Sequence, residues 1–270
     1  MMIRGAFLIA LLAGALLVAS SAPAASKAAY YVSLGDSLAQ GYQPTGGPLK
    51  SGNAPPGYNQ GYADQLFKLM RDRYEQLQEV KLGCGGETTT TMRFGGGFCS
   101  YTEGSQLAEA VAFLEEHPGE IAFVTVDIGG NDLVAGGVGA IVANLPVILA
   151  ELEAVAGPNV PIVGMNYYDP FLPSAWEQGG LAGLQAEVAG SVGFNDVLEG
   201  IYTAAGVPVA DVENAFSVMD LTLVDGTPLN VLRECEWTWA CAHEPFGFDI
   251  HANSDGYGVI AQALADVLAP

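Results

Sequence analysis

The feature that most constrains the fold is an apolar run at residues 30–34 that stops abruptly at Gly35-Asp36-Ser37-Leu38. The run is rich in residues that favour β-structure, and a helical pattern follows it later in the chain. This combination predicts a buried strand that ends in a tight turn, with the Ser37 hydroxyl at its carboxyl end. Ligands bind at that end of open parallel sheets. Taken alone, the four residues also fit a β-turn in which Asp36 and Ser37 cap a helix.

Strand and helix patterns alternate through the rest of the chain. Further strands are predicted at residues 79–82, 121–128, 160–166 and 207–212, and helices at 58–77, 105–117, 141–156, 181–205 and 255–268. In the first helix we expect Tyr62, Leu66, Leu69, Met70 and Tyr74 to face the core. Residues 43–57 are predicted to form a loop at the rim of the site, and residues 218–248 are predicted to be irregular. This order favours one α/β/α sandwich in three layers around a central parallel sheet.

The N-terminus has the pattern of an export signal. A short basic start is followed by an uncharged apolar run at residues 6–18, by small residues at 20–26, and by Ala22-Pro23-Ala24, which fits a cleavage site. We therefore expect a signal peptide at residues 1–25, a single mature domain at 26–270 and an extracellular protein. A membrane anchor is the alternative, but the run is too short to span a bilayer comfortably. No other segment is expected to cross a membrane.

Four cysteines form two groups in the sequence, Cys84 with Cys99 and Cys235 with Cys241. Four cysteines allow three pairings, and the two local pairs are the simplest. The alternative is a metal site made by Cys235, Cys241 and His243. Because an exported protein meets an oxidising compartment, and because the chain has no C-x-x-C pair, we expect two disulfides and no metal.

The charge balance excludes some partners. The chain has 30 acidic and 9 basic residues, which give a formal net charge of −21. A surface of this sign repels nucleic acids and anionic membranes. Charge alone identifies no substrate.

The sequence supplies the groups that a reactive serine needs. A serine hydroxyl requires a base, usually histidine, and donors for an oxyanion. Of the three histidines, His251 follows an irregular segment and precedes a helix, while His117 is expected to be a helix-end cation. Turns at Gly86 and Asn131 also follow predicted strands. All these groups could meet at one edge of the sheet, although a structural role for His251 is the alternative.

These residues carry a family resemblance. Gly35-Asp36-Ser37-Leu38, Gly86 in Gly-Glu-Thr-Thr, Gly130-Asn131-Asp132 and His251 match, in order, the four blocks of the SGNH hydrolases, also called GDSL esterases/lipases. The resemblance runs from about Tyr30 to the C-terminus. It is strongest to secreted bacterial members with an aromatic segment such as residues 167–172 and a cysteine pair before the histidine. The resemblance implies a flavodoxin-like SGNH hydrolase fold.

The resemblance also implies roles for individual residues. Ser37 would be the nucleophile that becomes acylated, and His251 would be the general base and then the general acid. The backbone N–H groups of Ser37 and Gly86 and the side-chain amide of Asn131 would form the oxyanion hole. The implied reaction is two-step ester hydrolysis without a metal or cofactor.

One position departs from the family pattern. The family places an aspartate three residues before the histidine, where this chain has Phe248, and the aspartate here is Asp249, two residues before. In an extended segment the two spacings point to opposite sides. Either the chain turns so that Asp249 reaches His251, or a backbone carbonyl such as that of Phe248 orients the ring. We expect Asp249, with a purely turn-forming role as its rival.

The substrate is the least constrained part of the prediction. Aromatic and apolar residues could line an acyl pocket, belong to the core or stack on a sugar: Tyr168, Phe171, Leu172, Trp176, Trp237 and Trp239. Because no long apolar lid segment is present, we expect small-molecule, lipid or carbohydrate esters with short or medium acyl chains. A carbohydrate O-deacetylase, an acyltransferase with the same site, and a non-catalytic extracellular binding protein are the alternatives.

Overall fold

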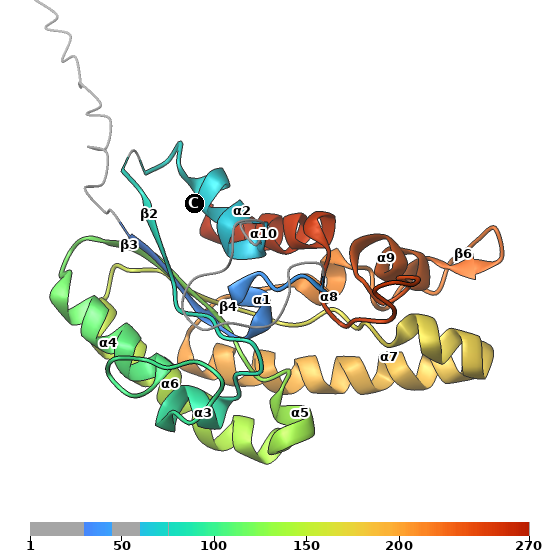
Figure 1. The fold of residues 1–270 in the computed structure, drawn as a ribbon, viewed down its shortest axis with the longest axis horizontal. Helices are drawn as coiled ribbons and strands as arrows, with labels where there is room; N and C mark the ends of the chain where they lie inside the picture. The colour runs from blue at the N-terminus through green and yellow to red at the C-terminus, as the bar shows by residue number, and fades with distance from the viewer. Residues whose placement is uncertain (1–29, 45–59, 75, 270) are drawn as a thin grey trace, which may run out of the picture.

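A computed structural model describes residues 30–44, 60–74 and 76–269 of the chain (Figure 1). The expected signal peptide and most of the predicted rim loop lie outside the described residues.

The centre of the fold is a five-stranded parallel sheet with the strand order β2-β1-β3-β4-β5. Its strands are β1 (Tyr30–Gly35), β2 (Gln78–Lys81), β3 (Ile121–Asp127), β4 (Ile162–Met165) and β5 (Val209–Ala210). Every residue of β3 is buried, as expected for a parallel strand that is covered on both faces. This order is that of flavodoxin-like folds, so the predicted fold class is confirmed.

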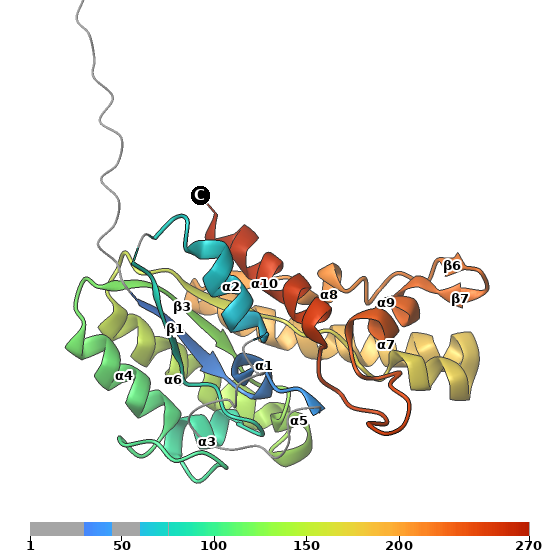
Figure 2. The same ribbon diagram turned by 45° about the horizontal axis from the view of Figure 1, so that its top comes forward.

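Helices cover both faces of this sheet (Figures 1 and 2). One side carries α2 (Tyr62–Met70), α8 (Val212–Ala215) and α10 (Ser254–Leu268), and the other carries α3 (Thr89–Phe94), α4 (Gln106–Glu116), α6 (Val138–Ala156) and α7 (Leu172–Ala205). Two helices of one turn, α1 (Ser37–Gln40) and α5 (Asp132–Ala135), follow strands β1 and β3 directly. Parallel strands place their carboxyl ends along one edge, so α1 and α5 begin at the same edge of the sheet.

Several expectations about elements were wrong in detail, and α7 begins at Leu172 rather than at residue 181. Helix α2 ends at Met70 rather than at residue 77, and Leu69 stays half exposed instead of facing the core. The region 218–248 is not irregular throughout, because it contains a hairpin, β6 (Leu223–Val224) with β7 (Thr227–Pro228), and helix α9 (Leu229–Trp237). The hairpin turn is Asp225-Gly226, with φ angles of 51° and 89°. The sequence Asp-Gly is typical of a two-residue hairpin turn, but no hairpin was predicted here.

The expectation that no segment beyond the N-terminus is long and apolar enough to cross a membrane was wrong for helix α6. Among the described residues it is the one helix long and apolar enough to cross a membrane by length and composition. It packs against α3, α4 and α7, and its buried face includes Ile141, Leu145 and Ile148. The helix continues through Pro146, as predicted.

Candidate active site

Ser37 is the first residue of α1 and directly follows the turn at the end of β1. Asp36 caps this short helix, since its Oδ1 accepts a hydrogen bond from the Leu38 N–H at 2.9 Å. Gly35 has a φ of +146°, and a side chain there would collide with the Asp127 carboxyl group. Only glycine therefore fits this position, which explains why the serine turn begins with it.

His251 reaches Ser37 from the loop between α9 and α10. Its Nε2 lies 2.8 Å from Ser37 Oγ, and its Nδ1 lies 2.7 Å from Asp249 Oδ1. Backbone hydrogen bonds fix the loop, because the N–H of Trp239 donates to the carbonyl of His251 and the N–H of Asp249 donates to the carbonyl of Trp239. The serine, the histidine and the aspartate thus form one continuous hydrogen-bonded chain.

A local turn explains how Asp249 reaches the ring despite its unusual spacing. Asp249 Oδ1 also accepts the backbone N–H of His251 at 2.9 Å, which folds the side chain back over the next two residues. The segment is therefore not extended, and the two-residue spacing places the carboxylate against Nδ1. Burial acts to raise the pKa of the Asp249 carboxyl, but the hydrogen bonds and charge of His251 outweigh it and leave that pKa lowered.

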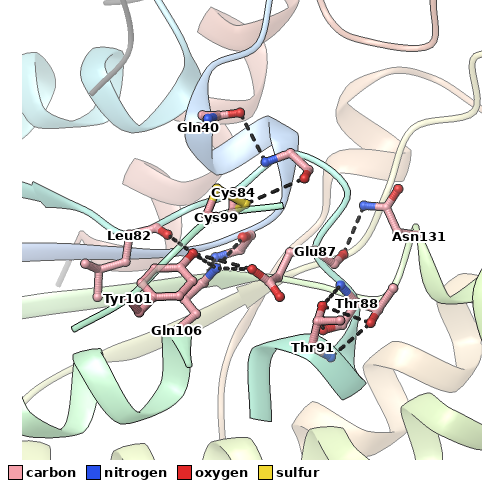
Figure 3. Close-up of a disulfide and its surroundings, with 12 residues drawn as sticks. Gln40, Leu82, Cys84, Glu87, Thr88, Thr91, Cys99, Tyr101, Gln106 and Asn131 are labelled. Carbon is pink, nitrogen blue, oxygen red and sulfur yellow. Dashed lines mark hydrogen bonds between the residues drawn. A yellow bond between two sulfur atoms is a disulfide. The ribbon is translucent and has the colours of Figure 1, made fainter. Parts of the chain in front are cut away.

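Asn131 is hydrogen-bonded to Glu87, the residue that follows Gly86, and Figure 3 shows this bond. Asn131 precedes α5, and its Nδ2 donates to the carbonyl of Glu87 at 3.0 Å. Gly86 has a φ of +76°, and a side chain there would meet the ring of Phe98. Asn131 lines the same cavity as Ser37 and His251, whereas Gly86 lines a neighbouring cleft.

A buried polar network, which no sequence pattern predicts, anchors the Gly86 turn. Gln106 on α4 donates through Nε2 to both the Gly35 carbonyl and the Glu87 carboxylate, and its Oε1 accepts the Gly35 N–H. Tyr101 Oη accepts from Gln106 Nε2 at 2.9 Å, donates to the Leu82 carbonyl at 2.8 Å and lies 3.4 Å from the Glu87 carboxylate. Burial raises the pKa of the Glu87 carboxyl. The network ties the turn that bears Ser37 to the turn that bears Gly86.

Two buried carboxyl groups lie beneath the serine. Asp36 Oδ2 accepts from Tyr167 Oη at 3.3 Å, and Asp127 Oδ1 accepts from Tyr62 Oη at 2.7 Å. Burial is the largest cause that raises the pKa of both carboxyls, and the charge of Asp36 raises that of Asp127 further. Among the described groups no donor reaches Asp127 Oδ2, and the carboxyls of Asp127 and Asp36 interact directly, so a proton held by Asp127 and accepted by Asp36 would satisfy both side chains. No sequence motif predicted this pair.

A cavity of about 310 Å³ opens beside the serine. Its wall is mostly apolar and comes from α5, the loop after β4, α7 and the loop before α10. The apolar lining residues include Leu133, Val134, Tyr167, Tyr168, Phe171, Phe194 and Ile250. Of the six residues for which an acyl pocket, the core and sugar stacking were all open, Tyr168 and Phe171 line this cavity. Leu172, Trp176 and Trp237 pack in or against the core instead, and Trp239 donates to Gln43 Oε1 at 2.8 Å. The α5 residues were missed because short loop helices lack a hydrophobic period.

The cysteines form disulfides, and His117 lies at a helix end away from the serine. Cys84 is joined to Cys99 and Cys235 to Cys241 by disulfides, so the sulfurs proposed as metal ligands beside His243 are bonded to each other. His117 ends α4, stacks on Phe113 and contacts the Phe113 carbonyl through Nδ1 at 2.8 Å. Among the described residues, no group of three His, Cys, Asp or Glu side chains is placed to hold a metal ion.

Comparison with known proteins identifies the class. The family model of the GDSL-like Lipase/Acylhydrolase family matches residues 33–259 of the sequence, so the chain belongs to this family. No curated protein matched the chain in a sequence comparison.

Solved structures with the same fold include a putative GDSL-like lipase from Parabacteroides merdae, with 13% identity, coverage of 89% of this chain and 95% of that chain, and a TM-score of 0.57. An acetyl xylan esterase variant from Geobacillus stearothermophilus has 16% identity, coverage of 90% and 96%, and a TM-score of 0.53. An extracellular lipase from Streptomyces rimosus has 18% identity, coverage of 88% and 99%, and a TM-score of 0.55. At these identities the likeness shows the fold alone.

Proposed function

We propose that this chain is a secreted serine hydrolase that cleaves carboxylic esters through an acyl-enzyme on Ser37. The observation that carries the proposal is the hydrogen-bonded chain from Ser37 Oγ to His251 Nε2 at 2.8 Å and from His251 Nδ1 to Asp249 Oδ1 at 2.7 Å. Membership of the GDSL-like Lipase/Acylhydrolase family supports an esterase or lipase type of hydrolase.

The geometry supports a specific sequence of proton transfers. The Asp249 carboxylate keeps a proton on His251 Nδ1, which leaves Nε2 free to accept one from the Ser37 hydroxyl. Ser37 Oγ then bonds to the ester carbonyl carbon, and Nε2 returns the proton to the departing alcohol as the ester C–O bond breaks. Water repeats the steps on the acyl-enzyme and releases the carboxylic acid. Asp249 stays ionised and stabilises the imidazolium that forms in each step.

The oxyanion would be bound by neutral donors. Asn131 uses one N–H of its side-chain amide to bind the Glu87 carbonyl, and this bond fixes the orientation of the second N–H. The backbone N–H groups of Ser37 and Gly86 are the other proposed donors. Preorganised donors of this kind stabilise charge as it develops on the carbonyl oxygen.

The cavity beside Ser37 is the proposed acyl site. Its 310 Å³ corresponds to the volume share of about ten water molecules, at roughly 30 Å³ each. A short or medium acyl chain of similar atom count would fill it. Leu133, Phe171 and Phe194 offer that chain apolar contacts.

Export is proposed from the N-terminal pattern at residues 1–25 and is supported by the two disulfides, which persist in oxidising compartments. Expression of the full chain in a bacterial host followed by intact-mass measurement of the protein in the medium tests this. A product that begins near residue 25 is expected, and a full-length intracellular product would contradict export.

The proposed activity is tested with a panel of p-nitrophenyl esters from acetate to palmitate, acetylated xylo-oligosaccharides and added alcohol acceptors, with Ser37→Ala as the control. We expect hydrolysis that peaks at short or medium chains, and a fluorophosphonate adduct on the wild type but not on Ser37→Ala. A preference for acetylated sugars would favour the deacetylase, and ester formation on the alcohols would favour the acyltransferase. Labelling of Ser37→Ala at the wild-type rate would exclude Ser37 as the nucleophile.

A further inference from the structure

Exposed apolar side chains surround the mouth of the cavity. Leu133, Val134, Phe171 and Ile250 line the cavity and are also exposed to solvent. Phe248 lies against Phe171, with ring centroids 6.0 Å apart. Val134 is 91% exposed and Phe248 is 53% exposed. These five residues are called the apolar collar below.

The segments that form the apolar collar are almost free of charge. Residues 133–150 and 170–176 contain no Asp, Glu, Lys or Arg. Asp249 is the one acidic residue in 245–251, and its carboxylate is bound by His251. The uncharged surface continues along the start of α6, where Val138 and Val142 lie four residues apart and are both exposed.

The charge of the chain decides between possible partners of this surface. With a formal net charge of −21, two copies of the chain repel each other, and anionic lipid repels the chain as well. A neutral or zwitterionic lipid surface has no such penalty. It also presents ester groups and acyl chains at the depth that an apolar rim enters, and contiguous exposed apolar patches commonly mark such contacts.

We propose that the apolar collar docks the protein on neutral or zwitterionic lipid surfaces and delivers ester chains from that surface into the cavity. The proposal rests on the proposed function, since it takes the cavity as the acyl site. It concerns peripheral contact by side chains from α5 and the two loops, with the rest of the acidic surface in water. Figure 2 shows α5 and the loop between α9 and α10 beyond the end of β1 that carries α1.

Binding to vesicles tests the proposal without any turnover. Sedimentation with phosphatidylcholine vesicles should recover wild-type protein in the pellet, and vesicles of equal parts phosphatidylcholine and phosphatidylserine should recover less. Val134→Asp and Phe248→Asp should each weaken partition by at least about tenfold, because each replaces an apolar side chain that the lipid would bury with a charged one. Circular dichroism on each variant shows that it is folded.

The matched control is Leu223→Asp. Leu223 is 60% exposed and lies on the β6–β7 hairpin, which is separate from α5 in both Figures 1 and 2. This variant should bind phosphatidylcholine like the wild type. Absence of wild-type binding, or equal loss in Leu223→Asp, would overturn the proposal. A wild-type dimer in sedimentation velocity that Val134→Asp dissociates would overturn it in favour of a second copy.

Hydrolysis of a soluble p-nitrophenyl ester, measured beside the binding assay, separates the two proposals. Vesicle binding by a protein without esterase activity would contradict the proposed function and leave the docking surface in place. Esterase activity without vesicle binding would contradict docking alone.

Discussion

Two sets of carboxyl groups near Ser37 differ in what surrounds them. Asp249 lies at the solvent-facing side of the site, where His251 lowers the pKa of its carboxyl against the effect of burial. Asp36 and Asp127 lie beneath the serine, where burial raises the pKa of both carboxyls. The residue type is the same, and the environment shifts the carboxyl pKa in opposite directions.

This difference separates two parts of the site. We call the chain Ser37–His251–Asp249, together with Asn131, the reacting edge, and the buried pair Asp36 and Asp127 the foundation. At the reacting edge, an ionised Asp249 faces a ring that gains a proton during the proposed reaction. In the foundation, one proton between the two carboxyls would let them lie together, and the hydroxyl groups of Tyr62 and Tyr167 donate hydrogen bonds to them. The four predictions below test this division, beginning with the largest effect.

Asp249→Asn should cause the largest loss. An amide that donates to Nδ1 would favour the wrong histidine tautomer, and kcat should fall by as much as ~10⁴-fold, the loss found in a related serine triad. Steady-state kinetics on a p-nitrophenyl ester measures it, with circular dichroism as the folding control. A decrease smaller than about tenfold would leave a Ser37–His251 dyad and give Asp249 a turn-forming role only.

Asn131→Ala should come next. Loss of one oxyanion donor should lower kcat by roughly 10²–10³-fold with a smaller change in KM. The variant also loses the bond to the Glu87 carbonyl, so its thermal unfolding must be recorded beside the kinetics. If KM rises while kcat is unchanged, Asn131 binds the ground state and is not part of the reacting edge.

Asp127→Asn should have a small effect on turnover, within about tenfold, because a neutral amide replaces a carboxyl whose neutral form burial favours. Asp127→Ala leaves Tyr62 and Asp36 without this partner and should lower the free energy of unfolding by about 1–3 kcal/mol more than Asp127→Asn. Urea denaturation compares the two variants. A loss of turnover in Asp127→Asn as large as that in Asp249→Asn would abolish the distinction between edge and foundation.

The smallest expected effect is on stability as a function of pH. Burial raises the pKa of Asp169 and of Glu79 to about 7. A carboxyl whose pKa is raised by folding contributes stability that is fully present below its unfolded pKa and is lost as pH rises through the folded value. The Tm should therefore be a few degrees higher at pH 5.5 than at pH 8.

High salt distinguishes this effect from general repulsion among surface acids. Added salt screens exposed charges but acts little on buried groups. The difference in Tm between the two pH values should persist at high salt. A Tm that is lower at pH 5.5 would mean that the buried carboxyls are ionised in the folded protein.

Much of the fold and of the candidate site was predictable because local patterns encode it. A β-rich run before Gly35-Asp36-Ser37 predicts a strand and a turn, and the structure has β1 and α1 there. The alternation of strands and helices predicts a parallel sheet with helices on both faces, since each apolar face must be covered. Ser37, Asn131 and His251, all predicted from motifs, line one cavity.

Tertiary structure alone decided the rest. The contact between Asp249 and His251 Nδ1 depended on whether the chain turns at residues 249–251, and a spacing of two residues does not specify that. The pairing of Asp36 with Asp127, and the cavity between α5 and α7, join side chains that are distant in the sequence. Such contacts follow from how whole elements pack, whereas propensity and hydrophobic period describe only a residue's neighbours in the chain.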